Sequence, residues 1–374
     1  MAVNIADLER RARELLAPEI YDYYAGGSGQ ERTLRASEQA WQRYWLAPRV
    51  LRDVSAVDTS VRLPVPPHAV LRTPVAVAPT GFQGLAHPDG EVATATGAAQ
   101  AGALMVLSAR SSRKIEEVAA AVAGEGGTWW FQVYVMRDRS LTARLVERAV
   151  SAGAQALVLT GDTPVVGRKR RDRGADVITD TEFLVNLGPL ADLSAAEQAA
   201  DLTFADIGWL ARLSGVPVLV KGVLRADDAR ACVAAGADGV IVSNHGGRQL
   251  DGAMPAALAL PTVAEALSGS DIARTDGDIT GTRGETGRTG GDVFADGGLR
   301  TGETVLTALA LGAQAVFLGR PALWALVCGG AAGVRDLLTE ITNDLAHAMA
   351  LAGARSVADI PGVTAPATGN SLDM

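Results

Sequence analysis

Short apolar runs alternate with longer stretches of helical periodicity from about residue 70 onward. Each run is rich in Val, Leu or aromatic residues and is bounded by turn-forming residues, which is typical of a strand buried on both faces. The eight runs lie at residues 74–80, 103–108, 128–135, 156–162, 217–223, 239–247, 292–298 and 315–321. Eight strands that alternate with helices predict parallel β/α units, and this number favours a closed barrel over an open sheet.

A recurring tripeptide, Ala or Leu followed by Gly and Ala, supports this prediction. It precedes four of the runs, at residues 101–103, 152–154, 235–237 and 311–313. A glycine at that place suits the end of a helix that leads into the next strand. Residues 1–70 are predicted to form an N-terminal helical cap, and the segment after Ala331 a final amphipathic helix. We therefore expect one domain over residues 1–374, a (β/α)8 TIM barrel with an N-terminal helical cap and a C-terminal helix.

Two segments interrupt the alternation. Residues 165–205 form a long connection after the fourth run, on the side where barrel enzymes place their chemistry, and we expect an active-site lid loop there. Residues 268–291 are poor in apolar residues and rich in Gly, Thr and Asp. We expect this second segment to be a flexible surface insertion on the opposite face, without a catalytic role.

Composition narrows the class of protein. The chain has 374 residues, 48% of them hydrophobic, and a net charge of −8, so it can bury a large core and does not resemble a nucleic-acid-binding protein. Its two cysteines suggest neither a disulfide scaffold nor a metal site. The N-terminus carries charges throughout, and no apolar run reaches the roughly 18 residues of a membrane helix. We expect a cytoplasmic protein without membrane or nucleic-acid partners.

Polar residues follow the predicted strands at their carboxyl ends, where barrel enzymes carry their active sites. Packing alone does not place polar groups at the same end of every strand, so these residues predict a functional site. They are Pro79, Thr80, Gly81, Ser108, Gln132, Tyr134, Thr160, Asp162, Lys221, residues 243–248, Asp296, Gly297, Gly298, Gly319 and Arg320.

The sixth run ends in VIVSNHGGRQLDG, which places His245 and Arg248 on either side of two glycines. An imidazole titrates near neutrality and suits a general base, and a guanidinium binds a carboxylate through two parallel hydrogen bonds. The glycines allow a sharp turn that brings both side chains to one cavity. Asp162, at the end of the fourth run, is a candidate to orient His245 and to stabilise its protonated form.

The last two strands end in ADGGLR and GR, a combination of glycine turns with Arg300 and Arg320 that suits a phosphate-bearing ligand. Lys221 ends the fifth run, and two interpretations of it stay open. It could form a Schiff base, as in an aldolase or isomerase barrel, or it could act as a counter-charge to an anionic cofactor ring.

These residues together resemble the FMN-dependent α-hydroxy-acid oxidase and dehydrogenase family, which includes glycolate oxidase, lactate oxidase, mandelate dehydrogenase and 4-hydroxymandelate oxidase. SNHGGRQLDG matches the active-site signature of that family. The resemblance extends over nearly the whole chain, through YDYYAGGSGQERT, PTGFQGLAHPDGE, FQVYV, DTP, PVLVKGV, DGGLRTG and FLGRP.

The resemblance implies FMN-dependent oxidation of an (S)-2-hydroxy acid to the 2-oxo acid. Electrons would pass to flavin N5 and then to oxygen or another acceptor, in a homotetramer. His245 would be the base, Asp162 its partner, and Arg248 the carboxylate-binding group, with Tyr23 and Tyr134 hydrogen-bonded to the substrate. Lys221 would stabilise negative charge at the N1/O2 edge of the flavin. The other flavin-binding residues would be Pro79, Thr80, Gly81, Ser108, Gln132, Thr160, Ser243, Asp296, Gly297, Gly298, Arg300, Gly319 and Arg320.

Three residues depart from the family pattern. A second substrate arginine is replaced by Lys169, which keeps the charge and loses the bidentate geometry; Arg170 or Arg171 could take its place if the loop shifts. Arg110 stands where an apolar or aromatic side chain usually lines the pocket. It is either a solvated arginine or, with Lys169, a contact for an extra anionic group. Gly81 implies poor use of oxygen. The alternative function is oxidation of an atypical, biosynthetic or doubly anionic hydroxy acid, or of an amine-like substrate.

Overall fold

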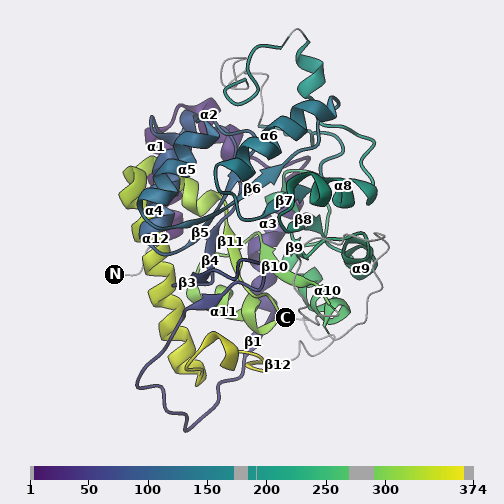
Figure 1. Cartoon of the computed structure of the whole chain (residues 1–374). Coiled ribbons are helices and arrows are strands. Elements are labelled where there is room, and N and C mark those ends of the chain that lie inside the picture. The colour runs from purple at the N-terminus through teal and green to yellow at the C-terminus, as the bar shows by residue number, and fades with distance from the viewer. Residues whose placement is uncertain (1–3, 172–183, 191, 269–289, 366–374) are drawn as a thin grey trace.

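The computed structural model describes residues 4–171, 184–190, 192–268 and 290–365, and its centre is a closed barrel of parallel strands (Figure 1). Each strand lies within one of the eight predicted apolar runs, so the predicted barrel is confirmed. Strands that follow one another in the chain pair side by side, and β11 pairs with β4 to close the ring. The strands are β4 (Val75–Val77), β5 (Leu104–Ser108), β6 (Thr128–Val133), β7 (Leu157–Thr160), β8 (Val218–Val223), β9 (Gly239–Val242), β10 (Asp292–Asp296) and β11 (Val316–Leu318).

Helices connect the strands and cover the outside of the barrel. They are α4 (Gly90–Gln100), α5 (Ile115–Gly124), α6 (Arg139–Ser151), α8 (Ala205–Ser214), α9 (Ala226–Ala234), α10 (Ala256–Leu267), α11 (Gly302–Ala310) and α12 (Arg320–Ala352). The recurring glycines lie just after α4, α6, α9 and α11, with φ between 70° and 106°. They end these helices in the left-handed region, as the tripeptide predicted.

Alternate residues of the strands fill the barrel interior. Trp130, Phe294 and Phe317 meet there, with ring centroids 5.7 to 6.2 Å apart. A hairpin of β2 (Val61–Arg62) and β3 (Val70–Leu71) immediately precedes β4 and adds buried apolar side chains to the same cluster. This hairpin therefore closes the amino-terminal end of the barrel and leaves the other end for the site.

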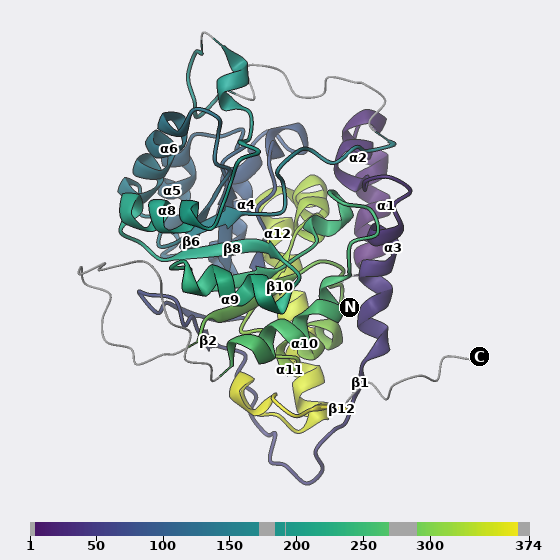
Figure 2. The ribbon, with the colours of Figure 1, turned by 90° about the vertical axis from the view of Figure 1, so that its right-hand side faces the viewer.

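The N-terminal cap is helical only as far as Arg43. It contains α1 (Ile5–Leu15), α2 (Pro18–Ala25), α3 (Arg32–Gln39) and the 3-10 turn η1 (Ala40–Arg43), which lie along one side of the barrel (Figure 2). Residues 44–70 contain four prolines, and these exclude a continuous helix. This stretch forms loops, the β2–β3 hairpin and β1 (Trp45–Leu46), which pairs with β12 (Thr364–Ala365).

The C-terminal helix begins earlier than predicted. α12 starts at Arg320, directly after the last strand, and bends at Gly329 and Gly330, so the predicted segment after Ala331 is its second half. By length and composition α12 could cross a membrane, which differs from the expectation drawn from the sequence. Half of its most apolar window is buried, and it packs against α1, α4 and α11, as core helices do.

The predicted lid and insertion are described only in part, because residues 172–183, 191 and 269–289 lie outside the described residues. The returning end of the predicted lid runs beside the segment after β6. Arg137 N donates to Glu197 O at 2.9 Å, and Ala199 N donates to Val135 O at 2.9 Å. This end is therefore held next to the carboxyl end of the barrel.

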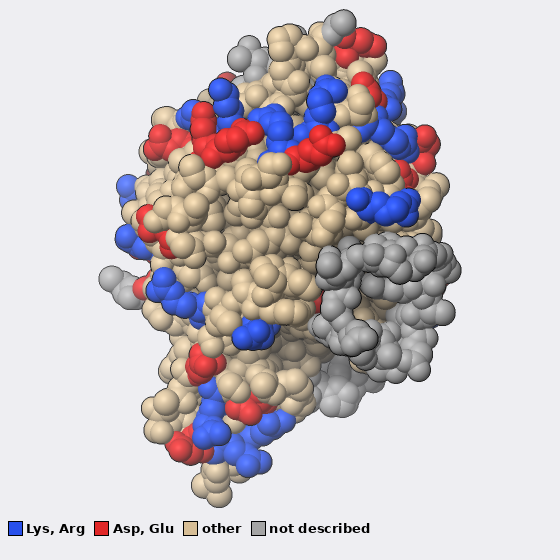
Figure 3. Space-filling model, viewed as in Figure 1, with Lys and Arg blue, Asp and Glu red and all other residues tan. Residues whose placement is uncertain are grey.

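Acidic and basic side chains are interspersed on the face shown in Figure 3 and do not gather into a patch of one sign. Several of the described surface charges form ion pairs, such as Arg148 with Glu116 at 2.9 Å. Such exposed pairs contribute little stability.

Candidate active site

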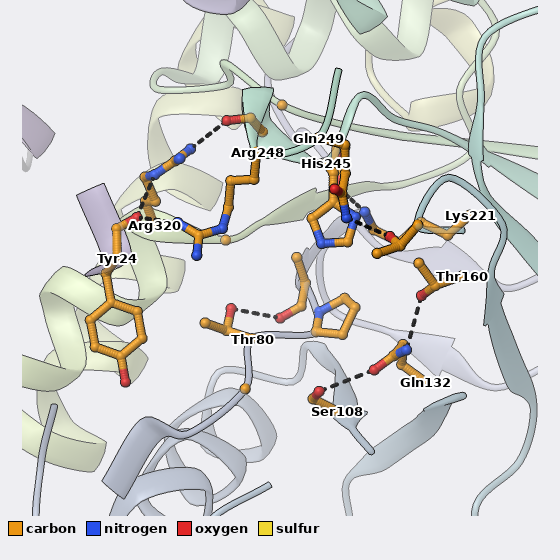
Figure 4. Close-up of a pocket in the computed structure, with 18 of the residues that line it drawn as sticks. Tyr24, Thr80, Ser108, Gln132, Thr160, Lys221, His245, Arg248, Gln249 and Arg320 are labelled. Atoms are coloured by element: carbon orange, nitrogen blue, oxygen red, sulfur yellow. Dashed lines mark hydrogen bonds and ion pairs between the residues drawn. The ribbon is translucent and has the colours of Figure 1, made fainter. Parts of the chain in front are cut away.

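The carboxyl ends of the strands surround a pocket of roughly 680 Å³ (Figure 4). All the side chains that sequence analysis assigned to substrate or cofactor line it, except Asp162 and Ser243, which are hydrogen-bonded to residues that do. The predicted residues in its wall are Tyr23, Pro79, Thr80, Gly81, Ser108, Arg110, Gln132, Tyr134, Thr160, Lys169, Lys221, His245, Arg248, Asp296, Gly297, Gly298, Arg300, Gly319 and Arg320.

His245 and Asp162 form a hydrogen-bonded pair, with Nδ1 3.0 Å from Oδ1, although they follow different strands, β9 and β7. Gly222 on β8 makes room for the carboxylate, because a Cβ there would lie 2.4 Å from the Asp162 Cβ. Burial on its own raises the pKa of Asp162, but the charge and hydrogen bond of His245, and then Lys221, bring that pKa below its ordinary value. With Nδ1 held by the carboxylate, Nε2 is the ring nitrogen left for a substrate.

The turn that carries His245 passes through the left-handed region at three consecutive residues. In η4 (His245–Gly247) the φ angles are 57°, 61° and 73°. A Cβ on Gly246 would lie 2.8 Å from Arg320 Nη1, and one on Gly247 would lie 2.6 Å from Leu34 N. Glycine fits both positions, and the resulting turn brings His245 and Arg248 to the same pocket.

Arg248 is anchored through one nitrogen. Its Nη1 donates to the carbonyl oxygens of Tyr23, Tyr24 and Gly26 at 2.8, 3.1 and 3.0 Å, at the C-terminal end of α2, where a cation is favoured. Its guanidinium lies over the Tyr23 ring, 5.3 Å from the centroid. In the described part of the chain Nε and Nη2 have no hydrogen-bond partner, so they are available to a carboxylate.

Tyr134 and Arg110 line the wall of the pocket near Tyr23. Burial, reinforced by Asp162, raises the pKa of Tyr134, so the phenol remains a hydrogen-bond donor. Burial lowers the pKa of Arg110 to about 10, and the guanidinium stays charged at neutral pH. Its Nη2 donates to Ala196 O at 2.7 Å. The structure therefore differs from the interpretation of Arg110 as a solvated arginine.

Three neighbouring strands contribute a row of linked polar groups. Ser108 Oγ donates to Gln132 Oε1 at 3.0 Å, and Gln132 Nε2 donates to Thr160 Oγ1 at 2.9 Å. Pro79, Thr80 and Gly81 continue the row after β4. This row offers both donors and acceptors to one edge of a flat heterocycle.

Lys221 is buried on β8, with Nζ 2.8 Å from Asp296 Oδ2 and 2.7 Å from Ser243 Oγ. This ion pair and hydrogen bond occupy the amine, whereas a Schiff-base lysine must present its amine to a carbonyl group. The geometry thus favours the counter-charge interpretation. The other oxygen of Asp296, Oδ1, is buried without a hydrogen-bond partner among the described residues.

The loops after β10 and β11 form the opposite end of the pocket. Gly298 has φ of 77°, and a Cβ there would lie 2.0 Å from Ser37 O. The first turn of α12 lines the pocket, and its free N–H groups suit an anion. Arg320 is half-buried and donates to Tyr24 O, Gly246 O and Gly26 O at 3.0, 2.9 and 3.1 Å, while its removal from solvent lowers its pKa to about 9. Arg300 completes this end and pairs with Glu38.

These groups fit FMN. The N-terminus of α12 and the two arginines suit a phosphate, because Arg320 uses three of its five N–H groups on the protein. Asp296 Oδ1 suits a ribityl hydroxyl. The row from Ser108 to Thr160 and the ammonium of Lys221 suit the polar edges of the isoalloxazine ring.

Lys169 lines the pocket, and its main chain bridges to Ser28. The neighbouring arginines are directed elsewhere: Arg170 hydrogen-bonds Gln30, and Arg171 Nη2 donates to Glu31 Oε2 at 2.8 Å. Neither of them lines the pocket, so they do not take the place of Lys169.

Two residues that were not predicted to have a role hold the site together. Tyr24 Oη donates to Phe82 O at 2.5 Å and joins α2 to the loop after β4. Gln249 Nε2 donates to Thr163 Oγ1 at 2.7 Å, and its Oε1 accepts from Gly167 N at 2.8 Å. Both residues stand within the motifs YDYY and HGGRQ, but their partners are far away in the chain.

The chain matches known proteins over nearly its whole length. Residues 12–365 match the model of the family described as FMN-dependent dehydrogenase. An L-lactate oxidase from Nostoc sp. is 39% identical, with 96% of each chain covered, and a 4-hydroxymandelate oxidase from Amycolatopsis orientalis is 40% identical, with 95% of this chain and 96% of that one covered. A crystal structure of mandelate oxidase has a TM-score of 0.84 at 41% identity, covering 96% of this chain and 97% of that chain. The protein belongs to the FMN-dependent dehydrogenase family and is an oxidoreductase with FMN as its cofactor.

Proposed function

We propose that the protein oxidises an (S)-2-hydroxy acid to the corresponding 2-oxo acid. The observation that carries this proposal is the hydrogen bond between His245 and Asp162, next to the available edge of the Arg248 guanidinium, in one pocket. The pair supplies a base, and the guanidinium supplies a site for a carboxylate. The names of the similar proteins, lactate oxidase and 4-hydroxymandelate oxidase, support the same class of substrate.

Oxidation of a 2-hydroxy acid removes two electrons and two protons. Bound FMN would supply the acceptor for the two electrons and for one of the two protons. Arg248 holds the substrate carboxylate through Nε and Nη2 and fixes its orientation. His245 accepts one proton at Nε2, and the Asp162 carboxylate stabilises the imidazolium that results. Tyr134 stays protonated and donates a hydrogen bond to the substrate, while the Lys221 ammonium supplies positive charge toward the flavin.

Three more specific points are also proposals: the electron acceptor, the assembly and the compartment. We propose that electrons pass from the flavin to oxygen or another acceptor. Gly81 favours an acceptor other than oxygen, because the family resemblance links a glycine there to slow use of oxygen. We also propose a homotetramer, from that resemblance, and a location in the cytoplasm.

The test is anaerobic reduction of the bound flavin by a panel of (S)-2-hydroxy acids, followed by absorbance at the flavin maximum. The (R)-enantiomers are the matched control. At least one (S)-acid is expected to bleach the flavin, with its (R)-form much slower, and subsequent addition of oxygen or a dye identifies the acceptor. A flavin that no 2-hydroxy acid reduces would contradict the proposed function.

A further inference from the structure

A chain of hydrogen bonds leads from the loop after β7 to the pair of His245 and Asp162. Two of its members, Gln249 and His245, line the pocket (Figure 4). Gly167 N donates to Gln249 Oε1 at 2.8 Å, and Gln249 Nε2 donates to Thr163 Oγ1 at 2.7 Å. Thr163 Oγ1 donates to Asp162 Oδ1 at 3.2 Å. The chain therefore ends on the same carboxylate oxygen that holds Nδ1 of His245.

The direction of these hydrogen bonds follows from what each group can donate. The N–H of Gly167 is only a donor, so the amide of Gln249 must turn its oxygen toward Gly167 and its NH2 group toward Thr163. The Thr163 hydroxyl accepts that bond, and its single proton is then left for Asp162 Oδ1. Every donor thus points along the chain toward Asp162, an arrangement in which each bond strengthens the next.

Few other groups hold the Asp162 carboxylate. Among the described residues only His245 and Thr163 donate hydrogen bonds to it, both to Oδ1, and the buried Oδ2 receives none. Burial raises the pKa of Asp162, whereas His245, Lys221 and the hydroxyl of Thr163 lower it. Thr163, itself buried, is therefore one of the groups that keep this carboxyl ionised.

The ionised state of Asp162 decides which nitrogen of His245 carries the proton. A carboxylate can only accept, so it takes the proton-bearing nitrogen, Nδ1, and leaves Nε2 with its lone pair. A protonated carboxyl would donate to Nδ1 instead. The ring proton would then lie on Nε2, which could not accept a proton from a substrate. A hydroxyl that donates to Asp162 Oδ1 opposes this second arrangement.

The backbone around Gln249 is tightly packed against the loop after β7. A Cβ on Gly167 would lie 2.5 Å from Arg248 O and 2.9 Å from Gln249 Cα. The carbonyl of Arg248 also accepts from Ser28 Oγ at 2.5 Å. A flip of the Gln249 amide would bring its NH2 group face to face with the N–H of Gly167. The amide is therefore fixed in the orientation that directs the Thr163 hydroxyl.

We propose that Gln249 and Thr163 are positioning residues for the base. Gln249 directs the hydroxyl proton of Thr163 to Asp162, and Thr163 keeps that carboxylate the acceptor for His245 Nδ1–H. This inference rests on the proposed function and deepens it, because it names the residues that prepare Nε2 to take a proton from a 2-hydroxy acid.

The first test compares two substitutions of Thr163 in the FMN-loaded enzyme. Thr163→Val keeps the shape of the side chain without the hydroxyl, and Thr163→Ser keeps the hydroxyl. Thr163→Val should lower the limiting rate of anaerobic flavin reduction about ten-fold, as the loss of a hydrogen bond to a charged group does, and Thr163→Ser should stay within about three-fold of the wild type. The Kd of the 2-oxo acid product, read from flavin absorbance, should change by less than about two-fold in both.

Thr339→Val is the matched control. It removes a hydroxyl from the exposed side of α12, away from the pocket, and should keep the wild-type rate and Kd. Equal rates in Thr163→Val and Thr163→Ser would overturn the inference. A Thr163→Val enzyme that loses affinity for the product as strongly as it loses rate would also overturn it, because the hydroxyl would then only support the shape of the pocket.

The second test asks whether Gln249 acts through Thr163. Gln249→Met keeps the length of the side chain and removes both of its hydrogen bonds, and it should lower the limiting rate about five-fold in the wild-type background. In Thr163→Val the hydroxyl to be directed is already absent, so Gln249→Met should lower the rate by less than about two-fold further. Equal losses in the two backgrounds would overturn the role assigned to Gln249.

The third test needs no turnover. The chain has four histidines, so the nitrogen NMR spectrum of enzyme labelled with ¹⁵N at histidine is simple, and His245→Asn identifies the signals of His245. At about pH 9, well above the ordinary pKa of an imidazole, His245 of the wild type should carry its proton on Nδ1, and Thr163→Val should shift part of the population to Nε2. An unchanged tautomer in Thr163→Val contradicts the inference.

Two outcomes are independent of how the variants fold or react. A wild type in which Nε2 of His245 carries the proton contradicts the inference whatever the variants do. Failure of the proposed function is distinct, since then no 2-hydroxy acid reduces the flavin of the wild type, while the tautomer of His245 can still be measured.

Discussion

At the scale of single residues, the hydrogen bond between His245 and Asp162 decides which ring nitrogen meets the substrate. The carboxylate holds Nδ1 at 3.0 Å, and Gly222 leaves the space that the carboxylate occupies. A neutral partner could keep the ring in place, but it would not stabilise the imidazolium that forms when the base takes a proton.

Asp162→Asn tests this assignment. We expect the rate of anaerobic flavin reduction to fall by about a hundred-fold or more, because the positive charge on His245 loses its counter-ion. FMN content should stay at the wild-type level. Asp227→Asn, an exposed position on α9, is the control and should keep the full rate. A wild-type rate in Asp162→Asn would contradict the assigned role.

Tyr134 gives a prediction for pH. Burial raises the pKa of Tyr134 above its ordinary value near 10, so the protonated phenol is favoured and persists from neutral pH to at least about pH 10. Tyr134→Phe should lower the rate of flavin reduction about ten-fold at every pH below that limit, because one hydrogen bond to the substrate is lost. Stopped-flow rates from about pH 6 to 10 check this. An alkaline midpoint that moves in the variant would show that Tyr134 itself titrates in this range.

At the scale of elements, η4 is the turn on which the site depends. It reverses direction within three left-handed residues, so that the base and Arg248 enter one pocket. The end of α2 complements it with backbone carbonyls that hold Arg248 and Arg320. The N-terminal cap is therefore part of the active-site wall.

Gly247→Ala tests the turn. Gly247 has φ of 73°, and a new Cβ would lie 2.6 Å from Leu34 N, which is backbone that cannot move aside cheaply. We expect a loss of at least about 2 kcal/mol in the free energy of unfolding, from the left-handed conformation and the clash together. Gly252→Ala is the matched control, with φ of 94° and nothing within 4 Å of a new Cβ, and it should lose about 1 kcal/mol. Equal losses in denaturant titrations would contradict the importance of the close approach.

At the scale of the whole molecule, the barrel was predictable because each of its elements has a recognisable pattern within a short stretch of sequence. Each strand is an apolar run, and α4, α6, α9 and α11 are each followed by a glycine whose φ the structure shows to be positive. The polar residues at the strand ends converge for the same reason, since parallel strands present their carboxyl ends on one side.

Other features depend on contacts between distant segments and were not predictable from local pattern. The β2–β3 hairpin has strands of only two residues, in a stretch rich in proline. The first half of α12 is buried on nearly all sides, so it lacks the amphipathic pattern by which the second half was predicted. The side chain of Arg110 is anchored by the carbonyl of Ala196, which lies 86 residues further along the chain.

Removal of FMN should destabilise the whole molecule, because Arg300, Arg320 and the first turn of α12 converge on one site without their anion. We expect the melting temperature of the apoprotein to be ~5–10 °C lower than that of the FMN-loaded form in a calorimetric scan. Added FMN should restore it, and riboflavin, which lacks the phosphate, should restore less. Equal effects of FMN and riboflavin would contradict the assignment of the phosphate end.

The most direct measurement of the central claim is the rate at which a 2-hydroxy acid reduces the flavin of His245→Asn under anaerobic conditions. Asparagine tolerates the left-handed conformation of this position and cannot act as a base. We expect the variant to keep its FMN, and the 2-hydroxy acid to reduce that FMN about a thousand-fold or more slowly than in the wild type. A variant that binds FMN and is reduced at the wild-type rate would contradict it.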